Sequence, residues 1–136
     1  FSNIVLDKVI NSDEVLGANY FMEKYYKKFK FWIITGTPTK EIELIVEKRK
    51  IARFFTGIHG SPQNKRYWTE NLIKKHKLNR NEIIFLGDAT TDKEAADFSN
   101  IHFVLRENDE NKDYFLHYKG HRFNDFYQLE KILNIT

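Results

Sequence analysis

The chain has 136 residues, a length that suits one domain with a substantial buried core. Hydrophobic residues make up 41% and aromatic residues 15% of the sequence, which excludes an intrinsically disordered chain. The sequence has no cysteine, which excludes disulfides and thiolate metal sites and fits a cytoplasmic location. No apolar run reaches the length of a membrane span, so no membrane partner is expected.

The positive residues behind the net charge of +3 do not indicate a nucleic-acid partner. They are spread over the stretches EKYYKKFK, EKRKIAR and NLIKKHK, and acidic residues interleave two of the three. Each stretch is typical of the solvent-facing side of an amphipathic helix. We therefore expect solvated helix surfaces and no nucleic-acid binding, while the oligomeric state is left open.

Strands and helices are predicted to alternate along the chain, after an ambiguous N-terminal segment. Thr37 and Ser61 are predicted N-caps, each followed by a proline at the first helical position. The expected elements are a helix over 18–28, a strand over 29–35, a helix from 37, a strand over 54–59, a helix from 61, a strand over 82–87, a helix over 92–100, a strand over 101–106 and a helix over 124–133.

This alternation predicts an α/β fold, Rossmann-like, with three α/β/α layers and a mainly parallel sheet. In such sheets, ligands bind at the carboxyl ends of the strands. Polar residues follow the predicted strands at those ends: Thr35 and Gly36, then Lys65, then Asp88 and Asp92. A hydroxyl, a backbone amide and an ammonium can bind phosphate oxygens, and aspartates can hold Mg²⁺. The sequence therefore predicts a site for an anionic substrate together with a divalent cation.

Several of these residues also have a purely structural interpretation. Thr35 could simply end a strand, and Lys65 could be an ordinary surface lysine. The stretch 91–94 matches a capping box, with Asp92 in the first turn, where the helix dipole favours an acid. Capping does not account for Asp88, which follows a predicted buried strand through a glycine. The ordered set on one edge of the sheet favours the functional interpretation.

The stretches FWIITGTP, GSPQNK and FLGDATTD, in this order and at these spacings, resemble the second, third and fourth motifs of the haloacid dehalogenase-like (HAD) hydrolases. The resemblance covers about residues 16–106. It implies a Mg²⁺-dependent phosphohydrolase acting on a small phosphorylated metabolite. By this resemblance, Thr35 and Gly36 would bind the phosphoryl group, and Lys65 would neutralise it together with the nucleophile. Asp88 would ligate the Mg²⁺, and Asp92 would be a second ligand or an outer-shell partner that acts through water.

The first motif of the family, DxDGT, carries a nucleophilic and an acid–base aspartate, and no such motif is present. In one explanation, residues 1–15 are the end of a cap segment, residues 16–136 form an incomplete HAD-like core, and the nucleophile lies upstream. In the other, NIVLDKV is a degenerate first motif. Its residues 4–6 would then form the central strand, Asp7 would stand at the nucleophile position, and Val9 would replace the general acid.

We favour the cap explanation, which predicts a sheet without its central strand. Either explanation predicts that the isolated chain is a poor phosphatase. The alternative to an enzyme is a non-catalytic HAD-like module that binds phosphate or a partner protein. The sequence does not specify the substrate, because the cap contributes much of the substrate choice in capped members of the family.

Overall fold

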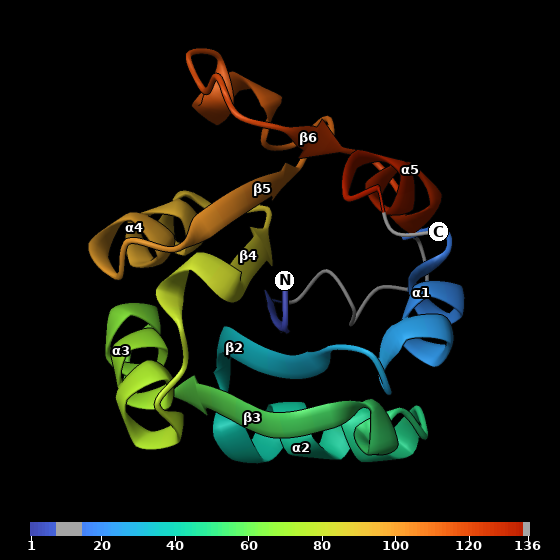
Figure 1. Cartoon of the computed structure of the whole chain (residues 1–136), viewed down its shortest axis with the longest axis vertical. Helices are drawn as coiled ribbons and strands as arrows, with labels where there is room; N and C mark the ends of the chain where they lie inside the picture. The colour runs from blue at the N-terminus through green and yellow to red at the C-terminus, as the bar shows by residue number, and fades with distance from the viewer. Residues whose placement is uncertain (8–14, 135–136) are drawn as a thin grey trace.

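Six parallel strands form the middle layer of the computed structural model, which describes residues 1–7 and 15–134 (Figure 1). Their order across the sheet is β3-β2-β1-β4-β5-β6. This arrangement confirms the predicted α/β class. The strands are β1 (Asn3–Leu6), β2 (Lys30–Pro38), β3 (Phe55–Ser61), β4 (Ile83–Gly87), β5 (His102–Arg106) and β6 (Arg122–Phe123).

Helices cover both faces of the sheet (Figure 1). Successive side chains of a strand point to opposite faces, so Ile4 and Leu6 join one apolar cluster while Val5 joins the other. Because both faces are buried, the inner strands are continuous apolar runs. The first cluster receives side chains from α1 (Ala18–Tyr25), α2 (Thr39–Lys48) and α5 (Phe126–Ile132), and the second from α3 (Lys65–His76) and α4 (Thr90–Phe98).

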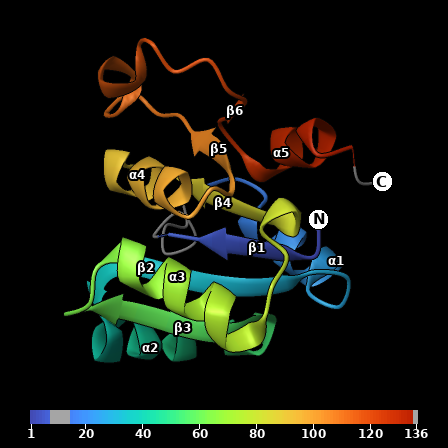
Figure 2. The ribbon, with the colours of Figure 1, turned by 60° about the vertical axis from the view of Figure 1, so that its left-hand side comes forward.

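The N-terminal segment supplies the central strand. Strand β1 lies between β2 and β4 (Figure 2), with Val5 opposite Trp32 on one side and opposite Phe85 on the other. The expectation that the sheet lacks its central strand is therefore wrong, and β1 is arranged as the second explanation describes. Residues 8–14, which include Val9, lie outside the described residues. The predicted boundary between a segment that ends at residue 15 and a core that starts at residue 16 stays a prediction.

Two helices start later than predicted. Pro38 is the N-cap of α2 rather than its first residue, because β2 continues to Pro38, which pairs with Ser61 of β3. Helix α3 begins at Lys65, because the side chain of Asn64 caps it by accepting a hydrogen bond from a backbone amide of the first turn at 2.8 Å. Ser61 therefore ends β3, and residues 62–64 connect this strand to α3 beside the carboxyl edge of the sheet. The two-residue edge strand β6 was not predicted.

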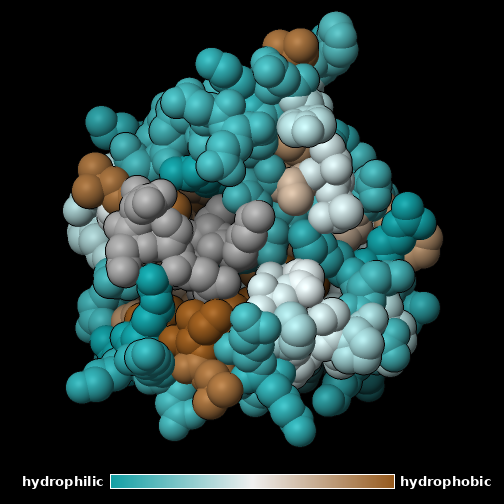
Figure 3. Space-filling view, turned by 180° about the vertical axis from the view of Figure 1, so that it is seen from behind, coloured by the Kyte–Doolittle hydropathy of each residue, from teal (hydrophilic) through white to brown (hydrophobic). Residues whose placement is uncertain are grey.

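The molecular surface is dominated by polar side chains on the face shown in Figure 3, where apolar residues form small separate groups. Lysines of the first basic stretch, Lys24, Lys27 and Lys28, are exposed. Within residues 1–7 and 15–134, no helix has both the length and the apolar character that a bilayer crossing requires.

An ion pair between Glu70 of α3 and Arg80 connects that helix to the turn before β4. Arg80 donates to the two carboxylate oxygens of Glu70 at 2.7 and 2.9 Å, and also to the carbonyl oxygen of Ser99 at 2.7 Å. The hydrogen bonds from Arg80 lower the pKa of Glu70 from 4.5 to about 2. Because this pKa is depressed, the stabilisation is complete above the unfolded value near 4.5 and is lost as the pH falls towards 2.

The Glu70→Gln variant is expected to have a free energy of unfolding lower by about 1 kcal/mol at neutral pH. Its stability should also decline less steeply than that of the wild type between pH 4.5 and 2. Urea denaturation across this pH range measures both effects. Glu94→Gln is the matched control, because Glu94 is 58% exposed and lies 4.0 Å from Arg66. An unchanged pH slope in Glu70→Gln would contradict the assignment.

Candidate active site

Three aspartates meet at the carboxyl edge of the sheet. Asp7 follows β1, Asp88 follows β4, and Asp92 lies in the first turn of α4. One carboxylate oxygen of each lies within 4.8 Å of the others. Asp7 and Asp92 are almost completely buried. The backbone amide of Asp7 donates to the carbonyl oxygen of Leu86 at 3.3 Å, which continues the ladder between β1 and β4 and places Asp7 beside the other two acids.

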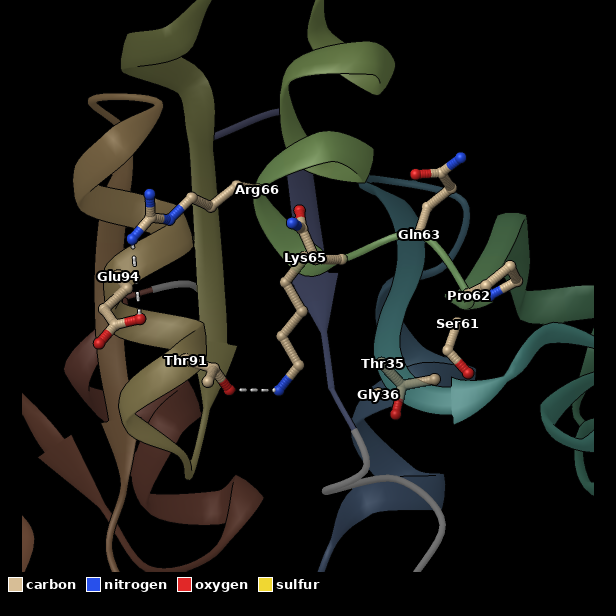
Figure 4. Close-up of a pocket in the computed structure, with 10 residues that line it drawn as sticks. Thr35, Gly36, Ser61, Pro62, Gln63, Lys65, Arg66, Thr91 and Glu94 are labelled. Atoms are coloured by element: carbon tan, nitrogen blue, oxygen red, sulfur yellow. Dashed lines mark hydrogen bonds and ion pairs between the residues drawn. The ribbon is translucent and has the colours of Figure 1, made fainter.

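Lys65, the first residue of α3, contacts two of these acids. Its Nζ lies 3.2 Å from Asp7 Oδ2 and 2.8 Å from Asp92 Oδ1. It also donates to Thr91 Oγ1 at 2.9 Å, as Figure 4 shows. Burial lowers the pKa of Lys65, but the charges of Asp92 and Asp7 more than offset this and the pKa is raised overall. Lys65 is therefore a fixed positive charge in the cluster at neutral pH.

The carboxylate of Asp92 serves both the helix and the site. Its Oδ2 accepts hydrogen bonds from the backbone amides of Asp88 and Ala89 at 3.2 and 3.0 Å, while Oδ1 faces Lys65. The capping and functional interpretations of this residue are thus compatible, although α4 begins at Thr90 rather than at 92. Burial and the charge of Asp7 raise the pKa of Asp92 well above its usual value, and Lys65 opposes this rise.

Glycine is required before Asp88 because α4 approaches the end of β4 closely. A Cβ atom on Gly87 would lie 2.4 Å from Asp92 Oδ2 and 2.5 Å from its Cβ atom. No other residue fits this space without displacing the Asp92 carboxylate. The Gly-Asp pair and the aspartate four positions later therefore form one structural unit, which is why their spacing was informative in the sequence.

Thr35 and Gly36 lie across a cavity of about 530 Å³ from Thr91 (Figure 4). The pairing of β2 with β3 is irregular after Ile34, which takes Thr35 and Gly36 out of the regular ladder. The hydroxyl of Thr35 is buried and accepts a hydrogen bond from the amide of Thr37 at 3.3 Å. The cavity is lined by Thr35, Gly36, Ser61, Pro62, Gln63, Asn64, Lys65, Arg66, Thr91 and Glu94.

The five residues predicted from the sequence fall into two groups in the structure. Asp88 and Asp92 belong, with Asp7, to the acidic cluster, which Lys65 contacts. Thr35 and Gly36 line the adjoining cavity together with Lys65. The sequence did not single out the hydroxyl of Thr91, because a threonine at a helix start is explained by capping alone. Asp7 was considered only in the explanation that was not favoured.

The donor set of the cluster suits Mg²⁺, which prefers carboxylate oxygens. Asp7 Oδ1 is buried and accepts no hydrogen bond from the described residues. A buried carboxylate oxygen without a donor costs free energy, and a cation would remove that cost. Among the residues that the structure describes, three carboxylates meet here, and Lys65 pairs with two of them, those of Asp7 and Asp92. The residues present therefore fit a divalent cation.

The fold and the site together define a class of protein. It is a doubly wound α/β domain with a cluster of aspartates and a lysine at the carboxyl edge of its sheet. The model of the haloacid dehalogenase-like hydrolases matches residues 8–105. The chain belongs to this family. The matched residues begin just after Asp7, so a role for Asp7 depends on the geometry described above. A comparison with curated proteins gave no match.

Solved structures of the family share the fold at low sequence identity. A haloacid dehalogenase-like hydrolase from Streptococcus pneumoniae has a TM-score of 0.75 and 16% identity, over 87% of this chain and 59% of its own. The core domain of a phosphoglycolate phosphatase candidate from Streptococcus pneumoniae TIGR4 has a TM-score of 0.74 and 18% identity, over 99% and 96% of the two chains. The hydrolase candidate YfnB from Bacillus subtilis, bound to magnesium, has a TM-score of 0.71 and 15% identity, over 88% and 55%.

Proposed function

We propose that this chain is the catalytic core of a Mg²⁺-dependent phosphohydrolase that acts on a small phosphorylated metabolite, with Asp7 as the nucleophile. The observation that carries this proposal is the contact of Lys65 with both Asp7 and Asp92 at the end of the central strand. Membership of a hydrolase family supports hydrolysis as the reaction. The neighbours described as a phosphoglycolate phosphatase candidate and as a magnesium complex support the substrate class and the metal.

In the proposed reaction, a carboxylate oxygen of Asp7 forms a bond to phosphorus as the bond to the leaving-group oxygen breaks. Lys65 neutralises negative charge on Asp7 and on the phosphoryl oxygens. The hydroxyl of Thr35 and the backbone amide of Gly36 bind the same oxygens from across the cavity. Water then hydrolyses the aspartyl-phosphate and releases phosphate. A Mg²⁺ held by Asp7, Asp88 and Asp92 would stabilise the charge that develops on the phosphoryl group.

The leaving group is expected to govern the rate. The resemblance to the family places a general acid two positions after the nucleophile, where this chain has Val9, which lies outside the described residues. Without a proton donor at that position, the leaving group departs as an anion. We therefore expect faster turnover of acetyl phosphate and p-nitrophenyl phosphate, whose leaving groups are weakly basic, than of alkyl phosphates.

Phosphate release from acetyl phosphate tests the proposal. We expect release in the presence of Mg²⁺ and not in the presence of EDTA. Asp88→Asn should lower the rate about 100-fold, because an amide is a poorer ligand than a carboxylate for a hard cation. Asp109→Asn, at a fully exposed side chain outside the cluster, is the control and should leave the rate unchanged. Full activity in Asp88→Asn would refute the metal assignment.

A non-catalytic phosphate-binding module is the second candidate, and the observation that favours it is Val9 at the general-acid position. Such a module would bind Mg²⁺ and inorganic phosphate together but would release no phosphate from acetyl phosphate or p-nitrophenyl phosphate. Calorimetric binding of phosphate in the presence of Mg²⁺, combined with the release assay, distinguishes the two candidates.

A further inference from the structure

The side chain of Asn111, in the connection that follows β5, is buried against two main-chain carbonyl groups. Asn111 is 7% exposed. Its Nδ2 donates to the carbonyl oxygens of Asp88 and Arg106 at 2.8 and 2.9 Å, and its Oδ1 accepts from the amide of Asn108 at 2.8 Å. These partners determine the orientation of the side-chain amide, since carbonyl groups only accept hydrogen bonds and the backbone amide only donates.

The two carbonyl groups belong to the carboxyl ends of neighbouring strands. Gly87 of β4 and Leu105 of β5 are the last residues that pair between these strands. Asp88 and Arg106 come directly after them, where the ladder has ended. Asn111 connects the two chains at this point, so its side chain replaces the next step of the ladder at the edge that carries the acidic cluster.

The main chain of Asp88 is consequently held on both sides of its Cα atom. Its amide donates to Asp92 Oδ2 at 3.2 Å, and its carbonyl oxygen accepts from Asn111. Fixing both groups restricts the backbone dihedral angles of Asp88 and therefore the direction of its Cβ atom. We propose that Asn111 is a positioning residue that aims the carboxylate of Asp88 at the cation site. This inference rests on the proposed function, because it assumes that Asp88 is a Mg²⁺ ligand.

The surroundings of Asn111 support this role. Its amide donates to Asn108 Oδ1 at 2.9 Å, so the loop that presents Asn111 is closed by a reciprocal pair of hydrogen bonds. A cavity of about 250 Å³ lies between this loop and Asp88, with Thr90 and Tyr114 also in its lining. Because that side of Asp88 borders a cavity, the loss of the Asn111 bond would leave Asp88 room to shift.

Titration of the protein with Mg²⁺ alone, followed by calorimetry, tests the inference. We expect the dissociation constant of Mg²⁺ to rise about tenfold in Asn111→Ala, the lower end of the effect of outer-shell partners on metal affinity. Asn111→Asp is the second variant, because it keeps the shape of the side chain and removes both donors. The dissociation constant refers to folded protein, so a purely structural role of Asn111 would not change it.

Tyr118→Phe is the matched control. The hydroxyl of Tyr118 also donates to two carbonyl oxygens, those of Phe103 and His121, both at 3.1 Å, and neither of these belongs to Asp88. We expect this variant to lose thermal stability and to keep the Mg²⁺ affinity of the wild type.

The possible outcomes separate the inference from the proposed function. Absence of Mg²⁺ binding by the wild-type protein would overturn the proposed function and this inference with it. In a second outcome, the wild type binds Mg²⁺ and the dissociation constants of both folded Asn111 variants lie within about twofold of its value, instead of the expected tenfold change. That outcome overturns the inference alone. A weakened affinity in either folded Asn111 variant, with Tyr118→Phe unchanged, supports it.

Discussion

The Asp7→Asn variant is expected to lose phosphohydrolase activity by at least about 1,000-fold, because an amide oxygen cannot form the aspartyl-phosphate. Without Mg²⁺, its free energy of unfolding is expected to equal or exceed that of the wild type. The charge of Asp7 raises the pKa of the buried Asp92, which means that the two carboxylates destabilise each other in the folded state. Asparagine removes that repulsion with little change in volume, and Lys65 keeps its contact with Asp92.

Mg²⁺ should reverse this order of stability. A ligand that binds the folded state stabilises it in proportion to its affinity, and the wild type offers the cation one more carboxylate than the variant does. Urea denaturation in EDTA and in Mg²⁺ measures both orders, and the release assay measures the activity. A rate in Asp7→Asn above about a tenth of the wild-type rate would refute the assignment of Asp7 as the nucleophile.

The part of the candidate site whose close spacing could be predicted from the sequence is the part encoded locally. Gly87 and Asp92 constrain each other through a contact between residues only five positions apart, so their spacing carries the information. The placement of Asp7 depends instead on the pairing of β1 with strands that begin at Lys30 and Ile83. A strand of four residues has too weak a local pattern to show that it occupies the centre of a sheet. The cap explanation was favoured because Val9 stands where the family's first motif has its general acid.

The sequence also could not predict which polar residues of irregular segments are buried and which partners they bind. Asn111 lies in a stretch, ENDENKD, that is typical of a solvated loop, yet its side chain is buried. Its bonds to Asp88 and Arg106 form only when β4 and β5 lie side by side. Hydrophobic periodicity reports which residues enter the core and gives no signal for a buried amide that satisfies main-chain carbonyl groups. Hydrophobic periodicity likewise gives no signal for the hydrogen bond from Lys65 to the hydroxyl of Thr91.

The Lys65→Met variant is expected to lose activity by about 1,000-fold, because no fixed positive charge then faces the phosphoryl group. In EDTA, its free energy of unfolding should fall by about 3 kcal/mol, which is the lower end of the cost of removing one partner from a buried ion pair. Methionine fills the volume of the lysine stem, so the loss is one of charge rather than of packing. Lys65 has a side chain only 13% exposed, so solvent screens its two contacts weakly.

The pH and metal dependence of Lys65→Met identify the cause of its instability. Lys65 opposes the rise in the pKa of Asp92, so its removal should raise that pKa further. A carboxyl group whose pKa is raised by folding destabilises the folded state above its unfolded pKa, and this cost disappears as the pH falls towards 3.8. The deficit in unfolding free energy should therefore shrink on acidification, and Mg²⁺ should restore more stability to the variant than it adds to the wild type. Lys93→Met, at a lysine of α4 whose side chain is 37% exposed, is the control and should show neither effect. A deficit that is the same at every pH and insensitive to Mg²⁺ would show that Lys65 contributes packing alone and would remove the electrostatic basis of the proposed site.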